Sequence, residues 1–317
     1  MKRYAWITDP HLNFLSSQQR LDFISEVQDC GVDGVFMTGD ISEGHELINH
    51  LQEWNLNFGS KLWFILGNHD FYNTGVDALR EKLHPYCVNI WDKLYYLSEH
   101  IFPVSLGHGV GLVGMDGWGD GHYGDPYNTR LLMSDWMLIK DLIPFRDDRD
   151  LLLSKLQDLA RVDANLARES LRMALEDYDE VVFLTHVPPW PESALYKGKR
   201  SDPNFAPWFI NKTMGDMLLD VAHTYPDKTI HVLSGHVHSP SYFRVTKNMY
   251  ARTSGAVYND PKVTRIFTID DRDLECEECR AKTKSGFGWV AAPPSVYFCS
   301  EYCGIAFGYN IKDLEEL

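Results

Sequence analysis

The segment Leu62-Trp63-Phe64-Ile65-Leu66 runs directly into Gly67-Asn68-His69-Asp70. Five apolar residues in a row, followed by a glycine, are typical of a buried β-strand. The next four residues bring a tight turn, an amide oxygen, an imidazole and a carboxylate to the end of that strand. Because the reactive crevice of an open α/β sheet lies outside the carboxyl ends of its strands, this stretch predicts such a sheet with a site at its edge.

Four other apolar segments end in the same way. Short runs of apolar, β-branched and aromatic residues next to glycine or proline are the signal of strands. Residues 4–8 precede Asp9 and His11, residues 34–38 precede Asp40, residues 181–185 precede His186, and residues 229–234 precede His236 and His238. The repetition extends the predicted site to five strand ends.

Composition allows an enzyme with a large core and argues against one class of function. The chain has 317 residues, of which 44% are hydrophobic, so it can fold as one large domain or as two. Its formal net charge of -15 argues against a protein that coats nucleic acid non-specifically. An acidic protein can still bind phosphate if metal ions supply positive charge.

The start of the chain shows no targeting segment, because Met1-Lys2-Arg3 leads at once into the first predicted strand. A secretory signal would begin with an apolar core of about 7–15 residues. A membrane-spanning helix would need about 18 or more consecutive apolar residues, and the sequence contains no such run. We therefore expect a cytoplasmic protein that does not enter a membrane.

Helical patterns separate the first three predicted strands. Residues 18–30 carry apolar side chains at helical spacing and stop at Gly31, and residues 47–54 mark a second helix. The order is therefore β-α-β-α-β. Right-handed crossovers make such strands parallel neighbours with their carboxyl ends on one side. The residues that follow the strands are then expected to lie together: Asp9, His11, Asp40 and Asn68.

The rest of the chain predicts a second sheet and an insertion. Short strands are expected at residues 94–97, 101–104 and 110–115, and the later strands at 242–245, 249–253 and 263–269 suit a second, antiparallel sheet. Between these groups, a glycine-rich loop and a helix with an apolar stripe lead us to interpret residues 117–178 as a helical insertion over the site. The stripe consists of Leu152, Leu156, Leu159, Val162 and Leu166. Two sheets covered by helices make an α/β fold, a four-layer αββα sandwich over residues 1–272.

The residue types at the strand ends favour metal chemistry. Aspartate, asparagine and histidine provide the mixed oxygen and nitrogen ligands of divalent transition metals. No Ser-His-Asp or Cys-His arrangement is evident in the sequence. Asp40 is suited to bridge two ions about 3.5–4 Å apart, and water held between them would be acidified to a hydroxide nucleophile. This predicts hydrolysis of a phosphate ester without a covalent enzyme intermediate.

In their order along the chain, these motifs resemble the calcineurin-like metallophosphoesterase superfamily. Its signatures are D-x-H, G-D, G-N-H-[DE], a lone histidine and G-H-x-H, and all five occur within residues 1–270. The resemblance implies two divalent ions (manganese, iron or zinc). It implies that the first is held by Asp9, His11, Asp40 and His238, and the second by Asp40, Asn68, His186 and His236.

The resemblance also assigns roles beside the metals. His69 is implied to be a general acid, or a positive group beside the leaving oxygen, because its neighbour Asn68 already reaches a metal. Glu43 follows the bridging Asp40 by three residues, where some family members place the carboxylate that orients this histidine. Three roles are open for Asp70: support of the metal ligands from outside their shell, capping of the next helix, or orientation of a histidine.

Two departures from the protein-phosphatase branch of the family bear on the substrate. That branch continues its second motif as G-D-x-x-D-R-G, whereas this chain reads Gly39-Asp40-Ile41-Ser42-Glu43-Gly44 and lacks the arginine that grips phosphate. Its third motif ends in glutamate, and here the position is Asp70. Both favour a phosphodiesterase or nucleotide-type phosphoesterase. The alternatives are a nuclease acting on DNA or RNA, a phosphomonoesterase or protein phosphatase, and a non-catalytic scaffold stabilised by metal.

Two loops are candidates for substrate contacts. A basic cluster in an acidic chain is suited to meet phosphate groups, and aromatic side chains can stack on a base. The candidates are Lys197, Lys199 and Arg200 in one loop, and Trp118, His122 and Tyr123 in the other. The alternatives are a solvated run of charges and ordinary loop packing.

Four cysteines near the C-terminus form two closely spaced pairs: Cys276, Cys279, Cys299 and Cys303. Two such pairs separated by a loop match a tetrahedral structural zinc site. Disulfides are the alternative, which a cytoplasmic location disfavours. Because residues 297–303 resemble the second half of a treble-clef zinc finger, we predict a zinc-binding module over residues 273–317 that contacts a protein or a nucleic acid.

Overall fold

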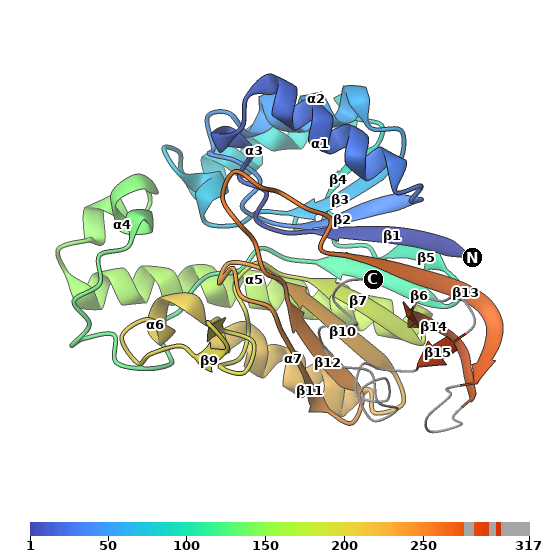
Figure 1. Ribbon diagram of the computed structural model, residues 1–317. Coiled ribbons are helices and arrows are strands. Elements are labelled where there is room, and N and C mark those ends of the chain that lie inside the picture. The colour runs from blue at the N-terminus through green and yellow to red at the C-terminus, as the bar shows by residue number, and fades with distance from the viewer. Residues whose placement is uncertain (276–281, 292–295, 299–317) are drawn as a thin grey trace.

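The computed structural model describes residues 1–275, 282–291 and 296–298, and it shows two large sheets packed face to face with helices on their outer faces (Figure 1). This arrangement confirms the predicted four-layer α/β sandwich. The cysteines of the predicted zinc site lie outside the described residues: Cys276, Cys279, Cys299 and Cys303.

The first sheet has the strand order β15-β14-β13-β1-β2-β3-β4. Strands β1 to β4 are parallel neighbours, and β13 pairs antiparallel with β1. The carboxyl ends of β1, β2 and β3 therefore lie on one edge, as the crossover rule predicts. The strands are β1 (Lys2–Ile7), β2 (Gly34–Thr38), β3 (Lys61–Ile65), β4 (Leu94–Tyr96), β13 (Arg265–Glu275), β14 (Lys282–Ala291) and β15 (Val296–Phe298).

The second sheet has the strand order β11-β12-β10-β7-β6-β5. Its four inner strands are parallel, and only the two edge strands run antiparallel to their neighbours. The strands are β5 (Val104–Gly107), β6 (Val110–Gly114), β7 (Glu180–Leu184), β10 (Thr229–Ser234), β11 (Ser241–Thr246) and β12 (Met249–Thr253).

Alternating side chains explain why the strands read as continuous apolar runs. In β3, Leu62 and Phe64 pack under the outer helices, whereas Trp63 and Ile65 pack against the second sheet. Strand β7 alternates in the same way between the outer helices and the first sheet. Because successive side chains of a strand point to opposite faces, a sheet that is covered on both faces needs apolar residues at every position.

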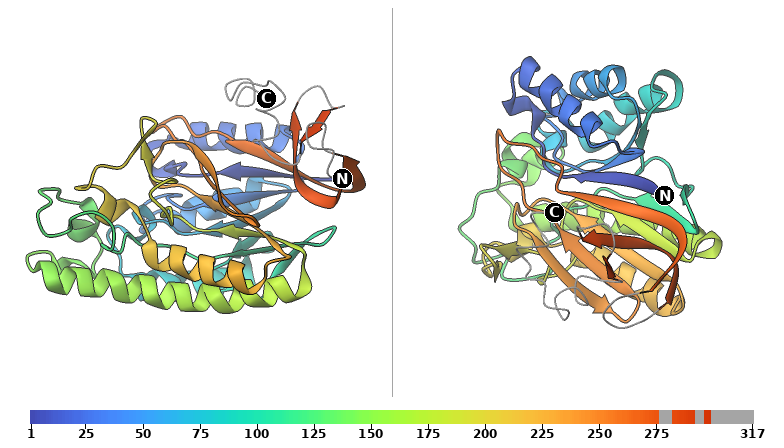
Figure 2. Two further views of the ribbon diagram at one scale, coloured as in Figure 1. Left: turned by 90° about the horizontal axis from the view of Figure 1, so that it is seen from below. Right: turned by 45° about the vertical axis from the view of Figure 1, so that its right-hand side comes forward.

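Helices α1, α2 and α3 cover the first sheet, and α5 and α7 cover the second (Figure 2). Helix α1 begins with a capping box between Ser16 and Gln19. The helices are α1 (Ser17–Asp29), α2 (Leu47–Asn57), α3 (Val76–Pro85), α4 (Ser134–Leu138), α5 (Arg149–Asp177), α6 (Ala206–Phe209) and α7 (Lys212–Thr224). The shorter turns are η1 (Leu12–Phe14), η2 (His69–Phe71), η3 (Tyr86–Ile90) and η4 (Ile143–Phe145).

Helix α5 is a covering layer of the second sheet, and it accounts for much of the segment expected as an insertion. Its Ala164, Ala167 and Leu171 pack in the core between this sheet and α7. Short side chains on that face allow the helix to lie close to its neighbours. Although α5 has 29 residues, no helix in the described part of the chain is both long and apolar enough to cross a membrane.

Three strand expectations were wrong in detail. The turn at His108 and Gly109, both with positive φ, makes a hairpin that places β5 at Val104–Gly107 rather than at 101–104. The second sheet is mostly parallel, not antiparallel. The strand expected at 263–269 is part of β13 and joins the first sheet, because the backbone of Thr264 bonds to the carbonyl of Trp6 at 2.8 Å and starts pairing with β1.

Candidate metal centre

Loops from both sheets meet at the edge where the parallel strands end. They follow β1, β2 and β3 in the first sheet and β7 and β10 in the second. The side chains predicted as metal ligands are all brought together there. Six are buried, Asp9, His11, Asp40, Asn68, His186 and His236, and His238 is partly exposed.

Backbone strain is concentrated in these loops. The left-handed region is disfavoured for residues that carry a Cβ atom, and such strain collects at functional sites. The loops after β1 and β2 are held in place by the amide of His11, which donates to the carbonyl of Asp40 at 3.1 Å. Five of the predicted ligands have positive φ: Asp9 (47°), His11 (42°), Asp40 (50°), His236 (69°) and His238 (50°).

Two glycines allow the loops to approach each other. A Cβ atom on Gly67 would lie 2.2 Å from Oδ1 of Asp40, and one on Gly235 would lie 2.3 Å from Oδ2 of Asp9. Real Cβ atoms do not come so close to another heavy atom, so a larger residue would displace either carboxylate. Glycine is therefore required at position 67 beside the carboxylate of Asp40 and at position 235 beside the carboxylate of Asp9.

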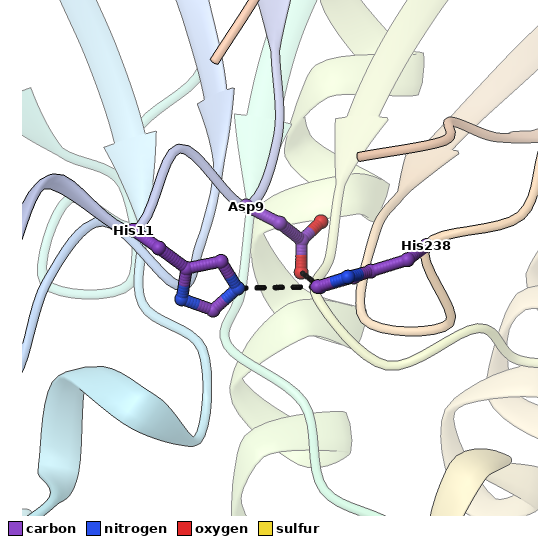
Figure 3. Close-up of side chains that lie close together, drawn as sticks. All are labelled: Asp9, His11 and His238. Atoms are coloured by element: carbon purple, nitrogen blue, oxygen red, sulfur yellow. Dashed lines mark hydrogen bonds and ion pairs between the residues drawn. The ribbon is translucent and has the colours of Figure 1, made fainter. Parts of the chain in front are cut away.

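The first group of side chains is Asp9, His11 and His238 (Figure 3). Nε2 of His238 lies 3.3 Å from Oδ1 of Asp9 and 3.2 Å from Nε2 of His11. The amide of His236 donates to both oxygens of Asp9, at 3.0 and 3.1 Å. This bifurcated hydrogen bond fixes the carboxylate against the two imidazoles.

The second group is Asp40, His186 and His236, with Asn68 between the two imidazoles. Nε2 of His186 lies 3.3 Å from Oδ1 of Asp40. Oδ1 of Asn68 lies 3.1 Å from Nε2 of His186 and 2.9 Å from Nδ1 of His236. Because Nδ1 of His186 donates to the carbonyl of Thr38 at 2.8 Å, Nε2 is the atom that the neutral ring offers as a ligand.

Asp40 links the two groups. Its Oδ1 is the neighbour of His186, and its Oδ2 lies 3.9 Å from Nε2 of His11 and 3.8 Å from Nε2 of His69. The carboxylate thus turns one oxygen toward each side of the cluster. This is the arrangement that a bridging ligand between two ions requires.

Burial and charge set different protonation states within the cluster. Burial opposes the ionisation of Asp40, but the charges of His186 and His69 hold the pKa of this carboxyl well below its usual range. Burial would lower the pKa of His186, yet the charge and hydrogen bond of Asp40 raise it to about 10. For His11 and His236 burial dominates, and it lowers the pKa of His11 to about 4 and that of His236 to about 3. Burial also opposes protonation of His238, but the hydrogen bond and charge of Asp9 raise its pKa.

These residues fit a pair of divalent cations. In each group the possible ligand atoms lie within 4.8 Å of one another, and Nδ1 of His236 faces Oδ1 of Asn68 at 2.9 Å. Imidazoles that burial keeps neutral are in the form that ligates metals. Together with ionised carboxylates and an amide oxygen, they suit manganese, iron or zinc.

Asp135 and Tyr72 position Asn68, and sequence reasoning missed both. Oδ1 of Asp135 accepts hydrogen bonds from Nδ2 of Asn68 and from the hydroxyl of Tyr72, each at 2.8 Å. With its nitrogen engaged, the amide turns its oxygen toward the two imidazoles. Tyr72 lies four residues after Asn68, a spacing that could have suggested it. Asp135 comes from α4, 67 residues further on, and no local pattern marks it.

Asp70 ties two loops of the site together. One carboxylate oxygen accepts the amide of Ser42 and the other accepts the amide of Gly67, both at 2.8 Å. Burial and the charge of Asp40 raise the pKa of Asp70 well above its usual range. Of the three roles left open, these contacts correspond to support of the ligands from outside their shell.

His69 lies at the edge of the cluster, and Glu43 does not contact it. The ring of His69 stacks on Tyr72 with centroids 4.4 Å apart, and its amide donates to Asp40 at 2.9 Å. Glu43 instead accepts a hydrogen bond from Asn73 at 3.2 Å and lies 4.0 Å from His45. The orienting role expected for Glu43 is therefore not supported, because these two neighbours hold its carboxylate elsewhere.

The aromatic loop contributes less to the site than expected. Trp118 is only 3% exposed and donates from Nε1 to Asp163 at 2.9 Å, so its ring is packed rather than free to stack. Nδ1 of His122 lies 3.2 Å from the carboxylate of Asp120. Tyr123 packs on a small separate cluster of apolar residues.

The basic loop forms an exposed two-stranded hairpin of β8 (Leu195–Tyr196) and β9 (Lys199–Arg200). Nζ of Lys197 lies 5.2 Å from the ring centroid of Tyr196, and Arg200 forms an ion pair with Glu192. The hairpin therefore presents cationic side chains to solvent, with one of them partly neutralised.

The chain is similar to known proteins in sequence and in fold. A family model described as calcineurin-like phosphoesterase matches residues 2–240. Among solved structures, the phosphopantetheinyl hydrolase of Mycobacterium tuberculosis is 19% identical with a TM-score of 0.53, over 80% of this chain and 89% of that chain. A dimetal phosphatase from Danio rerio is 14% identical with a TM-score of 0.48, over 80% and 87% of the two chains. No curated protein matches the chain. The first structural likeness shows the fold alone.

Proposed function

The chain belongs to the calcineurin-like phosphoesterase family and is a metal-dependent phosphoester hydrolase, and we propose that its substrates are phosphodiesters or nucleotide-type esters. Family membership implies a centre of two divalent ions. It argues against the alternative that the protein is a non-catalytic scaffold. We propose that the ligands of one ion are Asp9, His11, Asp40 and His238, and those of the other are Asp40, Asn68, His186 and His236.

The position of Asp40 carries this proposal. It is buried, it is ionised against its desolvation cost, and it has His186 near one oxygen and His11 near the other. A buried, ionised carboxylate is costly unless positive charge lies beside it, and the imidazoles can supply that charge only by keeping protons that metal ligation would remove. Two divalent ions would supply that charge.

When bound, two such ions acidify a water molecule and neutralise the oxygens of a phosphoryl group. The protein's own residues then orient and complete the site. Asp135 fixes the amide of Asn68, and Asp70 holds the loops after β2 and β3 at their observed separation.

His69 is proposed as the general acid or the positive group beside the leaving oxygen. It faces Asp40 at 3.8 Å but is not among the proposed ligands, and its side chain keeps 20% of its surface exposed. The stack on Tyr72 holds the ring in place. A partly exposed imidazole beside a buried metal cluster is in reach of a substrate oxygen.

The loop after β2 supports the choice of substrate class. Ile41 and Ser42, which follow the bridging carboxylate, are both buried. This loop carries no arginine that could hold the extra charge of a monoester dianion. A phosphodiester carries one negative charge on its phosphate instead of two, which agrees with a loop that offers no cationic side chain.

Hydrolysis of bis-p-nitrophenyl phosphate beside p-nitrophenyl phosphate tests the proposal. Protein stripped by a chelator should regain diester cleavage when manganese is added, and Asp40→Asn should lose it. A preference for the monoester would indicate that the protein is a phosphomonoesterase instead. No turnover with manganese, iron or zinc would overturn the proposal.

The exposed basic hairpin favours a second candidate, a nuclease that acts on DNA or RNA. Lys197, Lys199 and Arg200 would contact the phosphate backbone of a polymer beyond the ester that is cleaved. Such binding weakens steeply with salt, because each neutralised phosphate releases counterions. Salt-independent affinity for a single-stranded oligonucleotide would exclude this candidate.

We also propose a cytoplasmic location and a domain boundary near residue 272. After that boundary we propose a zinc-binding module. Support comes from the spacing of the four cysteines alone. Zinc measured in the purified protein should fall by one equivalent per chain in Cys276→Ser. Unchanged zinc content in that variant would contradict the module.

A further inference from the structure

Two exposed aromatic rings flank the imidazoles of the metal cluster. Phe14 is 47% exposed and Tyr258 is 45% exposed. The ring centroid of Tyr258 lies 4.5 Å from that of His11 and 5.0 Å from that of His238. The ring of Phe14 lies 6.0 Å from that of His11. Neither aromatic residue was singled out by the sequence.

The two rings meet each other at a right angle. Their centroids are 5.4 Å apart and their planes differ by 90°. This edge-to-face contact leaves a corner in which a third ring can stack on one aromatic side chain and touch the edge of the other. The corner adjoins His11, so it lies beside the phosphoryl position of the proposed reaction.

The backbone holds both rings where they are. Phe14 ends the short turn η1, and its amide donates to the carbonyl of His11 at 3.0 Å. Tyr258 lies in the segment between β12 and β13, which is tied at one end by Ser254 to Ser234 at 3.1 Å and at the other by Thr264 to Trp6 at 2.8 Å. The ring of Tyr258 itself packs on the imidazoles of His11 and His238, so the corner is part of the folded site.

Other rings of this protein are also exposed, Phe102 among them, but Phe14 and Tyr258 lie against an imidazole of the metal cluster. Covering an exposed aromatic ring with another apolar surface is favourable. A planar group attached to the scissile phosphate would be delivered to this surface when the phosphate binds.

We propose that Phe14 and Tyr258 form a subsite for the base of a nucleotide-type phosphoester. This inference rests on the proposed function, because the phosphate must bind at the metal cluster. It assigns base contact to these two rings instead of to Trp118, which is buried. The base stacks in the corner, and the metal cluster holds the phosphate.

The test compares two hydrolysis-resistant ligands on the full chain loaded with manganese: the phosphonate analogues of AMP and of ribose 5-phosphate. Calorimetry should show the AMP analogue binding at least about fivefold more tightly, the weak end of base stacking on aromatic side chains. Phe14→Ala and Tyr258→Ala should each reduce this ratio. The double variant should abolish it without changing the affinity for the ribose analogue.

Matched variants separate stacking from damage to the site. Tyr258→Phe keeps the ring and should keep the ratio, and Phe102→Ala removes an exposed ring that packs on His100 instead. Equal losses for both ligands in Phe14→Ala and Tyr258→Ala would overturn the subsite and mean that the rings only shield the metals. If simple esters are hydrolysed but the two analogues bind equally to the unmodified protein, the subsite alone fails. If neither analogue binds and no ester is hydrolysed, the proposed function fails with it.

Discussion

Asp135 accepts a hydrogen bond from Nδ2 of Asn68 at 2.8 Å, and this contact determines which way the amide of a proposed metal ligand points. The two residues come from different parts of the chain, since Asn68 follows β3 and Asp135 lies on α4. The segment between β6 and β7 therefore contributes to the site by orienting a ligand.

Removing that orientation should weaken metal binding. Asp135→Ala leaves the amide of Asn68 free to rotate, and loss of such a supporting contact typically costs 10–100-fold in metal affinity. Asp135→Asn keeps an acceptor and should lose less. Titration of the stripped protein with manganese measures the effect, and unchanged affinity in Asp135→Ala would contradict the positioning role.

Substitution of Gly67 should disrupt the site through a steric clash. The Cβ atom of Gly67→Ala would lie 2.2 Å from Oδ1 of Asp40, so the bridging carboxylate must move. Overpacking of this kind costs about 1–3 kcal/mol of unfolding free energy. Urea denaturation and manganese titration should both show a loss. Gly59→Ala, whose Cβ meets only the flexible end of Gln28, is the control, and equal behaviour of the two variants would refute the steric account.

His69→Asn should separate turnover from metal content. The proposed general acid lies outside the ligand sets, so the variant should bind two manganese ions normally while its turnover falls about 10²–10⁴-fold. Metal analysis and diester hydrolysis on the same sample give both values. Loss of one ion in this variant would show that His69 is a ligand, and full activity would remove it from catalysis.

A buried network away from the metals predicts a pH dependence of stability. NH2 of Arg80 lies 2.8 Å from Asp116 and 3.0 Å from Asp163, so two buried carboxylates share one guanidinium. Burial raises the pKa of Asp163 to about 6, despite the opposing charge of Arg80. The folded protein thus takes up this proton more readily than the unfolded chain does. Protonation of Asp163 therefore stabilises the folded protein. This contribution to the unfolding free energy is fully present below about pH 4 and is lost as the pH rises through about 6.

Asp163→Asn removes this titration and keeps an acceptor for Trp118. The unfolding free energy of the variant, relative to that of the unmodified protein, should rise by on the order of 1 kcal/mol between pH 5 and pH 8. Urea denaturation at the two pH values provides the comparison, with the exposed Asp158→Asn as control. A constant difference at both pH values would contradict the raised pKa.

The sequence predicted the parts of the fold that local patterns determine. The strand before Gly67 and the crossover rule together placed the loops after β1, β2 and β3 on one edge, as observed. Pairing across the chain was harder. The strand that begins at Arg265 pairs with β1 rather than with the second sheet, and no local pattern of residues indicates that partner.

The leucine pattern of α5 was also only partly informative. Leu152 and Leu156 are buried as the stripe predicted, but Val162 and Leu166 are 45% and 41% exposed. Further along the helix, alanines such as Ala167 face the core, because the close approach of the sheet and α7 leaves room only for short side chains. A pattern of large apolar residues cannot reveal such a face.

The same limit explains what was missed at the site. The five motifs brought the predicted ligands together, while the expectation for Glu43 rested on spacing alone, and Asn73 holds that carboxylate instead. Asp135 and Tyr258 reach the site from distant segments with no signature around them. Such supporting residues become visible only when the chain is folded.

The most direct test of the dinuclear centre is the electron paramagnetic resonance spectrum of the stripped protein reloaded with manganese, beside that of Asp40→Asn. A shared carboxylate predicts two manganese ions per chain with an exchange-coupled spectrum, and loss of the coupling in Asp40→Asn. A single manganese ion per chain with the spectrum of an isolated ion in the unmodified protein would contradict the account.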